Sequence, residues 1–308
     1  MCSYCRYSWS SFLIFKANKR QRFCWRFCIF TIFERNYNVI RNITIFNKEF
    51  SFYMIIALIG YFISGIYACY RFKQKGQDEN NMISFYLALS VGTLLGGHIL
   101  FGITNFYYLI CLFQKLFTLS FDSVSQFFLA CQFVFGGSVF YGGLIGGLIS
   151  GSLYLKYKKY DFGLYADTIA PCIPLFHFFG RLGCFFSGCC YGIESKIGFT
   201  YHNSLIEAAN GVRRFPIQLV EAGINLVLFI VLSYLESHNK CKKKLLLYYL
   251  TIYPICRFIL EYFRGDTYRG FVGCFSTSQF ISILILVCVL CYTIYQHIHI
   301  NKQNIGQK

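Results

Sequence analysis

The sequence predicts an all-α integral membrane protein in which about seven transmembrane helices form one bundle. The 308 residues are 56% hydrophobic and only 14% charged, whereas soluble domains carry about 25% charged residues. The apolar residues come in long runs rather than alternating with polar ones, so a large soluble core does not account for them. The chain length therefore corresponds to one membrane-embedded unit rather than to two soluble domains.

Seven apolar segments are near the roughly 20 residues that a helix needs to cross the hydrocarbon core. They cover residues 52–70, 83–110, 134–155, 164–186, 215–235, 245–263 and 277–297. The second is long enough to tilt, or to break into a re-entrant piece near Asn105. Glycine pairs in the third, at 142–143 and 146–147, predict close helix packing in lipid. These segments place the transmembrane domain at residues 51–300, followed by a short cytoplasmic tail at 301–308.

The net charge of +16 is concentrated between the apolar segments. The basic stretches are residues 71–82, 156–161, 236–244 and the tail after Tyr295, and they alternate correctly to be cytoplasmic by the positive-inside rule. Such clusters also favour anionic membrane lipid. The stretches 111–133, 187–214 and 264–276 are then predicted to be outer loops. Nucleic-acid binding is not expected, because no soluble domain is present to carry a basic face.

Residues 1–50 form a basic, aromatic-rich N-terminal extension that contradicts this orientation, because its positive charges would lie outside. The extension has no clear period, and no small-residue cleavage site supports a signal peptide. Three interpretations stay open: an extension upstream of the true start codon, an interfacial basic arm, or a targeting extension. We assign it no function.

The segment 176–192, FHFFGRLGCFFSGCCYG, places Arg181 deep in an apolar stretch. An arginine there costs several kcal/mol unless it is paired or faces water. The flanking glycines predict a break in the helix, which requires a protein- or water-lined cavity. An arginine beside such a break suits a phosphate, through its bidentate fork. The alternative is that Arg181 ends a span and extends to the interface.

A second intramembrane group lies in the segment TIYPICRFILEYFRGD. Tyr253, Arg257 and Glu261 follow one another at intervals of four residues, which places them along one helix face. Arg257 and Glu261 can partly neutralise each other, and this lowers the cost of keeping both in the bilayer.

Further polar residues occur near the ends of other spans: Asp167, Gln218 and Glu221. Asp167 is open to a simpler explanation, as an acidic residue favoured near a helix N-terminus. Two arginines and three carboxylates that converge in one bundle predict an anionic substrate handled at membrane depth.

The ordered motifs resemble the prolipoprotein diacylglyceryl transferase family. The resemblance covers residues 50–297 and rests on LLGGHILF, FGGSVFYGGLIGG, ADTIAPCIPLFHFFGRLGCFFSGCCYG, RRFPIQLVEA and IYPICRFILEYFRG. It implies a multi-pass transferase of the bacterial inner membrane that uses no metal or diffusible cofactor. The family moves the diacylglyceryl group of phosphatidylglycerol to the lipobox cysteine of prolipoprotein signal peptides. This first step of lipoprotein maturation releases glycerol phosphate.

The resemblance also implies residue roles. The implied catalytic residues are Arg181, Arg257, Tyr253 and Glu261, and Tyr141 is a further catalytic candidate because it stands at the position of the family's proposed base. The implied substrate-binding residues are Arg181, Gly142, Gly143, Asp167, Gln218, Glu221 and Tyr53. The two arginines would stabilise the anionic leaving group. The acceptor thiol is the nucleophile and needs a base, because an unperturbed cysteine has a pKa of about 8.5.

The chain departs from the family pattern at the position of the family's proposed base, where a His-Gly-Gly motif is replaced by Tyr141-Gly142-Gly143. A phenol with a pKa near 10 is a poor base unless a neighbouring cation lowers that pKa. The family's HPxQLYE histidine is Phe215, and its LGGR arginine is His98. His98 and His177 could compensate for the missing histidine, or could be hydrogen-bonded histidines of the bundle.

Cys184 and Cys189 replace the family's usual asparagine and glutamate, and Cys190 follows directly. Three thiols within seven residues could bind a metal or form a disulfide. The spacing C-x4-C-C is not a standard zinc pattern and no fourth ligand is evident. The sequence therefore predicts no metal site, and we expect these thiols to pack as small apolar groups.

Three other functions are weighed against the transferase. A divergent relative could transfer a lipid or glyceryl group to another acceptor. A carrier for an anionic solute often shows inverted repeats and paired broken helices, whereas this sequence shows no internal duplication. A non-catalytic scaffold would not need arginines buried at a cost.

Overall fold

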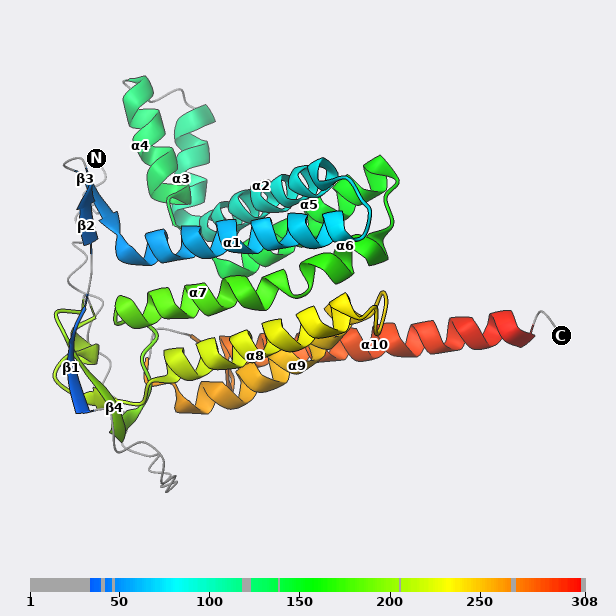
Figure 1. Cartoon of the computed structure of the whole chain (residues 1–308). Coiled ribbons are helices and arrows are strands. Elements are labelled where there is room, and N and C mark those ends of the chain that lie inside the picture. Colours follow the sequence, from blue (N-terminus) through cyan, green and yellow to red (C-terminus); the bar gives the residue numbers. More distant parts are fainter. Residues whose placement is uncertain are drawn as a thin grey trace.

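The helices of this protein run side by side as a bundle, with short strands gathered at one end (Figure 1). A computed structural model describes residues 34–39, 42–45, 48–117, 123–137, 139–204, 206–266 and 270–305. By length and composition, six segments within these residues could cross a membrane, namely Phe52–Gln74, Glu79–Thr104, Phe162–Phe186, Ile217–Ser237, Leu245–Phe263 and Thr277–Ile298. The prediction of a multi-pass all-α membrane protein is confirmed.

These six segments are built from seven α-helices, because the segment Phe162–Phe186 is divided into two. They are α1 (Phe52–Gln74), α2 (Glu79–Thr104), α6 (Phe162–Ile169), α7 (Cys172–Phe186), α8 (Ile217–Ser237), α9 (Leu245–Leu260) and α10 (Thr277–Ile305). The 3-10 turn η2 (Glu261–Phe263) prolongs α9. The third predicted segment, 134–155, is occupied by α5 (Phe140–Lys158), a helix of 19 residues.

Glycine faces bring α2 and α5 into backbone contact. A Cβ atom added to Gly96 would lie 2.2 Å from the carbonyl oxygen of Gly142, and one added to Gly146 would lie 2.1 Å from that of Gly92. Real Cβ atoms do not approach so closely, so these positions exclude any side chain. The predicted role of small residues in helix packing is confirmed for this pair.

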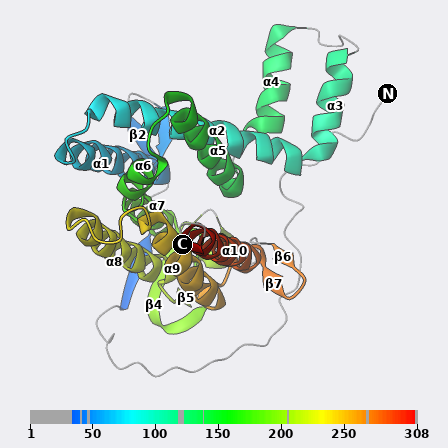
Figure 2. The same ribbon diagram turned by 90° about the vertical axis from the view of Figure 1, so that its right-hand side faces the viewer.

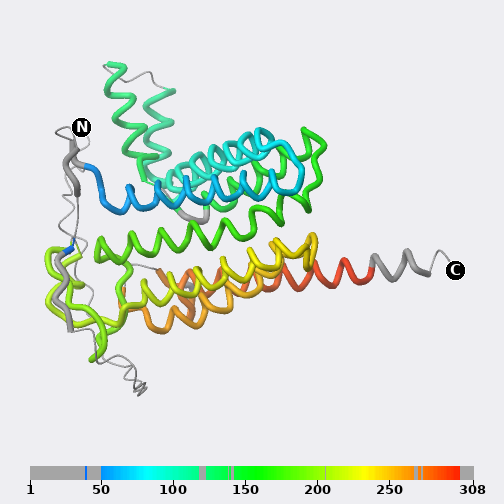
Figure 3. Tube along the Cα trace, in the orientation of Figure 1, coloured from blue at the N-terminus to red at the C-terminus, as the bar shows by residue number. Residues whose placement is uncertain are grey.

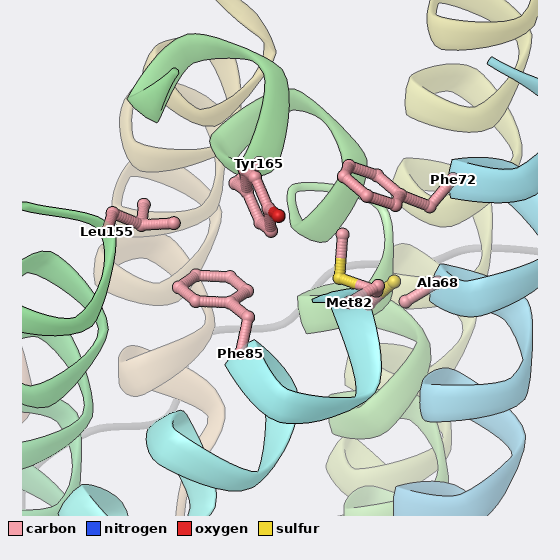
Figure 4. Packing of buried hydrophobic residues seen from close by; sticks show 7 residues of the cluster. Ala68, Phe72, Met82, Phe85, Leu155 and Tyr165 are labelled. Atoms are coloured by element: carbon pink, nitrogen blue, oxygen red, sulfur yellow. The ribbon is translucent and has the colours of Figure 1, made fainter. Parts of the chain in front are cut away.

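A hydrophobic cluster closes the bundle at the end that carries the basic turns. Phe72 of α1, Phe85 of α2 and Tyr165 of α6 pack against one another, with Met82 and Leu155 beside them (Figure 4). The cluster joins the ends of α1 and α5 to the start of α2, and it fixes α6 and the start of α7 against them.

The turns α1–α2, α5–α6 and α8–α9 lie at the same end of the bundle, together with the end of α10 (Figure 3). These are the basic segments of the sequence, so the predicted alternation of loops is confirmed. Arg71 and Lys73 also occupy the last turn of α1, where positive charge complements the helix dipole.

The stretch 111–133, predicted as an outer loop, is largely helical instead. After a break at Asn105, which was one of the two alternatives that the sequence left open, the chain forms α3 (Phe106–Phe117) and α4 (Val124–Phe135). The stretch forms helices because it is largely apolar and contains no glycine or proline. Its location outside stays a prediction. The two helices project from the side of the bundle near the end of α2 (Figures 1 and 2).

The predicted break around Arg181 is also wrong. Helix α7 continues through Gly180, Arg181 and Gly183 and ends at Phe186. Gly183 serves close packing, because a Cβ atom there would lie 2.9 Å from the ring of Tyr53 on α1. The chain bends elsewhere, between α6 and α7 and after Phe186.

Short strands and turns cover the other end of the bundle (Figure 1). Strand β4 (Glu194–His202) pairs in parallel with β1 (Glu34–Asn38) and antiparallel with β5 (Arg213–Arg214), and the 3-10 turn η1 (Glu207–Ala209) lies between β4 and β5. The hairpins are β2 (Asn42–Ile45) with β3 (Lys48–Ser51), and β6 (Phe271–Val272) with β7 (Phe275–Ser276). Of the N-terminal extension, residues 1–33 lie outside the described residues.

Candidate active site

The carboxylate of Glu221 is the centre of a buried polar cluster between α7, α8 and α9. Its side chain is 3% exposed. Arg181 of α7 donates to Oε1 at 2.8 Å, and Arg257 of α9 donates to Oε2 at 3.2 Å. The hydroxyl of Tyr253 also donates to Oε1, at 3.3 Å. The sequence predicted that two arginines and three carboxylates converge; the structure brings together both arginines, Glu221 and Glu261, whereas the third carboxylate, Asp167, lies elsewhere.

The cluster continues toward the strand-covered end as a chain of alternating charges. Arg257 contacts Glu261 at 2.9 Å, as the four-residue spacing predicted, and also donates to the hydroxyl of Ser278 on α10 at 3.1 Å. Arg264 lies 3.9 Å from Glu261 and donates to Asp266 at 2.9 Å. This pairing offsets the cost of burying each charge, and loss of any one member leaves its neighbours uncompensated.

The α-helical repeat positions the cluster. Residues four apart share a face, so α9 presents Tyr249, Tyr253 and Arg257 along one line toward α7 and α8. Tyr249 stacks on Tyr253 with ring centroids 5.4 Å apart, and its hydroxyl lies 3.0 Å from Nδ1 of His177 on α7.

Our sequence reasoning missed several members of this cluster. They are Tyr249, Ser278, Arg264 and Asp266. The signal for Tyr249 was its position one turn before Tyr253, and that for Arg264 was its position three residues after Glu261. Ser278 carried no such signal, because α10 reaches the site only through tertiary packing.

Arg181 is the more accessible of the two cations bound to Glu221. Its side chain is 20% exposed, whereas that of Arg257 is 9% exposed. Arg257 is also engaged by Glu221, Glu261 and Ser278. An incoming anion would therefore meet Arg181 first.

Gln218 lies on α8 one turn before Glu221, and Tyr53 lies near Arg181. Gln218 is 1% exposed, and its Nε2 donates to the carbonyl of Cys189 at 2.8 Å. Its Oε1 has no hydrogen-bond partner among the described residues. The ring of Tyr53 packs over Gly183, two residues after Arg181.

Other predicted site residues lie elsewhere. Asp167 is at the basic end of the bundle, where its carboxylate accepts hydrogen bonds from the backbone N–H groups of Lys243 and Leu245, the latter at 3.0 Å. It thereby caps the start of α9, which agrees with the simpler explanation of this acid. Gly142 and Gly143 are buried against α2. The side chain of Tyr141 lies outside the described residues.

The two histidines occupy different positions. Nδ1 of His98 lies 2.7 Å from the carbonyl of Phe135 and 2.8 Å from that of Gly137. Carbonyls only accept, so this nitrogen carries a proton and His98 is a hydrogen-bonded histidine of the bundle. His177 lies one turn before Arg181 on the unbroken α7, within the cluster.

Three thiols gather where α7 ends. The sulfur atoms of Cys184, Cys189 and Cys190 all lie within 4.8 Å of one another, and together they form the set within the described residues that could hold a metal ion. Hydrogen bonds with the other two thiols hold the pKa of Cys190 well below its usual range. The nearby charges of Arg181 and Arg264 lower this pKa further.

Comparison with known proteins places this chain in a family. The family model described as prolipoprotein diacylglyceryl transferase matches residues 41–295. The chain is 35% identical over 228 residues to phosphatidylglycerol--prolipoprotein diacylglyceryl transferase 2 of Clostridium perfringens, covering 73% of this chain and 82% of that protein. It is 34% identical over 220 residues to the corresponding Clostridium tetani transferase, covering 70% and 81%. The Clostridioides difficile transferase is 27% identical over 262 residues, covering 85% and 95%. Because the match extends from before α1 into α10 and includes every helix that contributes to the charge cluster, the chain belongs to the prolipoprotein diacylglyceryl transferase family.

Proposed function

We propose that this protein transfers the diacylglyceryl group of phosphatidylglycerol to the lipobox cysteine of prolipoprotein signal peptides. Glycerol phosphate is the second product, and the reaction takes place in the bacterial inner membrane. The observation that carries the proposal is the partly exposed guanidinium of Arg181, held by the buried carboxylate of Glu221. This arrangement offers a fixed positive charge to a lipid phosphate at membrane depth.

Arg181 stabilises the charge that develops during transfer. The acceptor thiolate attacks the glyceryl carbon that is bonded to the phosphate oxygen, and the carbon–oxygen bond breaks. The phosphate leaves with one more negative charge than it had in the lipid. A guanidinium already held in place stabilises this charge without reorganisation.

Glu221 and Arg257 position Arg181 in this scheme. Glu221 binds both arginines, and Arg257 is fixed by Glu261 and Ser278. Tyr253 donates to the same carboxylate and fixes it from a third direction. The orientation of Arg181 is thus set by groups on three helices.

We assign Gln218 and Tyr53 to the polar headgroup of the lipid. The unpartnered Oε1 of Gln218 can accept a hydrogen bond from a glycerol hydroxyl. Asp167, Gly142 and Gly143 contribute through the bundle that holds the site, because their contacts are with α9 and α2. A catalytic role for Tyr141, which stands where the family has its proposed base, stays a prediction.

Complementation tests the proposal. In a bacterium depleted of its own transferase, this chain is expected to restore the mass shift of a reporter lipoprotein. Arg181→Ala should lower the rate of lipidation by about 10²–10³, the usual effect of losing one charge-stabilising donor. Arg181→Lys should recover little, because an ammonium lacks the bidentate fork.

The matched control is Arg213→Ala, which removes an exposed guanidinium bound to the carbonyl of Lys196 at the same end of the molecule. It should lipidate at the native rate. A native chain that reaches the membrane without lipidating the reporter contradicts the proposal, and full activity of Arg181→Ala contradicts the role of Arg181.

A further inference from the structure

The three thiols beside Arg181 are brought together by the way in which α7 ends. The N–H of Cys189 donates to the carbonyl of Cys184 at 3.1 Å, and that of Gly188 donates to the carbonyl of Phe185 at 3.1 Å. Gly188 has a φ of 65°. This is a Schellman motif, which places the residue two beyond the helix cap over the residue three before it. Cys184 and Cys189 hold those two positions.

Cys190 completes the cluster through an unusual backbone conformation. Its φ of 53° is in the left-handed region, which is uncommon for a residue with a side chain. Two buried contacts hold the turn: Nε2 of Gln218 donates to the carbonyl of Cys189 at 2.8 Å, and the hydroxyl of Ser204 donates to the carbonyl of Gly188 at 3.3 Å. The cluster is therefore built into the fold.

The sulfur positions fit a zinc ion after small movements. A Zn–S bond of about 2.3 Å in tetrahedral geometry requires sulfur atoms about 3.8 Å apart. The three sulfurs already lie within 4.8 Å of one another. The turn at the end of α7 thus brings the three cysteines together without the sequence spacing that is usual for zinc ligands. The absence of that spacing was the reason why the sequence predicted no metal site.

We propose that Cys184, Cys189 and Cys190 bind Zn²⁺ and that the open fourth position of the ion binds the acceptor cysteine of the prolipoprotein. The second half rests on the proposed function. Three protein ligands with one open position are the arrangement of catalytic zinc sites, whereas structural sites have four protein ligands.

The ion generates the nucleophile. When the acceptor thiol binds Zn²⁺, its proton passes to water and the sulfur remains as a metal-bound thiolate. A lone pair of this sulfur then forms the bond to the glyceryl carbon, and the electron pair of the carbon–oxygen bond leaves with the phosphate. The glycerol phosphate takes up one proton from water, so the proton lost by the thiol is balanced. No oxidant or reductant takes part.

The surroundings of the thiols support this role. Four thiolates on one Zn²⁺ carry an excess of two negative charges, and both Arg181 and Arg264 interact electrostatically with Cys190. The carboxylates Glu221 and Glu261 are already engaged by arginines. A metal-bound thiolate needs no carboxylate base.

Metal content tests the first half of the proposal. The full chain, purified in detergent with reductant and incubated with zinc, should retain about one equivalent after desalting. Cys189→Ser and Cys190→Ala should each retain less than a tenth of that amount. Cys131→Ser is the control, because Cys131 is a partly buried cysteine on α4 outside the cluster, and it should retain native zinc. Size-exclusion profiles of all variants establish that they remain folded.

Cobalt(II) replacement tests the second half without reference to activity. The cobalt protein should show thiolate-to-metal charge-transfer absorption, and a lipobox peptide should raise it by about a third as a fourth sulfur binds. The same peptide with serine in place of cysteine should leave the spectrum unchanged.

Each of the other possible results contradicts one identified part of the proposal. A native chain that lipidates the reporter but retains no zinc, or that carries a disulfide among the three cysteines in its active form, overturns the zinc site and leaves the transferase intact. Zinc binding without a peptide-dependent cobalt spectrum overturns acceptor binding. Zinc and peptide binding in a chain that fails to lipidate the reporter overturns the proposed function and supports the metal site.

Discussion

Glu221 satisfies two arginines with the two oxygens of one carboxylate, and this bridging contact determines the electrostatics of the site. Arg181 binds Oε1 and Arg257 binds Oε2. Because the carboxylate is almost fully buried, each contact is screened little by solvent. Removal of its charge would leave two guanidinium groups close together in a medium of low dielectric constant.

We therefore predict that Glu221→Gln, which keeps the shape of the side chain, lowers the free energy of unfolding by about 3–5 kcal/mol, the usual cost of breaking a buried ion pair. The loss should appear as a lower melting temperature of the purified protein in detergent. Lipidation of the reporter should fall as well, because Arg181 loses the group that orients it.

Glu207→Gln is the matched control, since Glu207 is an exposed acid in the outer loop. It should melt at the native temperature. If Glu221→Gln melts with the control, the charge cluster does not stabilise the bundle.

At the scale of elements, α2 and α5 contact each other through their backbones, because glycines on the facing surfaces leave no side chains between them. Lipid tails are as apolar as leucine, so burial of large apolar groups adds little between membrane helices. Close backbone approach gives dispersion contacts instead. Carbonyl oxygens of Gly92 and Gly142 occupy the space where side chains of the facing helix would otherwise lie.

Gly96→Ala should accordingly destabilise the bundle, because the new methyl group would lie 2.2 Å from the carbonyl oxygen of Gly142. We expect a cost of about 1–3 kcal/mol, typical of overpacking, measured as a lower melting temperature. A Cβ atom at Gly223 of α8 meets nothing within 4 Å, so Gly223→Ala should be neutral or stabilising. Equal melting temperatures for the two variants would contradict backbone contact between α2 and α5.

At the scale of the whole molecule, the two ends of the bundle differ in their content of basic residues. Exposed lysines crowd the α8–α9 turn, where Cys241 lies among Lys240 and Lys242. The strand-covered end includes the β6–β7 hairpin, where Cys274 is exposed. From the positive-inside rule we predict that the first end faces the cytoplasm and that the second faces outside.

This orientation can be tested with a membrane-impermeant maleimide. In bacteria whose outer permeability barrier has been removed, Cys274 should be labelled in intact cells and Cys241 only after the membrane is permeabilised. Peptide mass spectrometry identifies the labelled residue. If Cys241 alone is labelled in intact cells, the predicted orientation is wrong, and the Arg181 site lies on the cytoplasmic side.

The spans and much of the polar cluster were predictable because both depend on local spacing. Long apolar runs give transmembrane helices, and residues four apart share a helix face, so Arg257 and Glu261 could be paired from the sequence alone. The helices α3 and α4 were missed because orientation reasoning assigned their residues to a loop. The continuity of α7 was missed because a glycine in a helix indicates either a break or a close contact with a neighbouring helix. For Gly183 only the structure distinguishes these two, because it shows the ring of Tyr53 packed against this glycine.

The sequence by itself determined the membrane class, the alternation of basic turns and the family, because hydropathy and ordered motifs are properties of the chain. Only the tertiary structure decided which charges on different helices meet. It joined Arg181 to Glu221, placed Asp167 at the opposite end as a helix cap, and gathered three cysteines around the end of α7. The physical reason is that these contacts connect different helices or depend on a helix-terminating turn, and their partners are set by packing rather than by spacing along the chain.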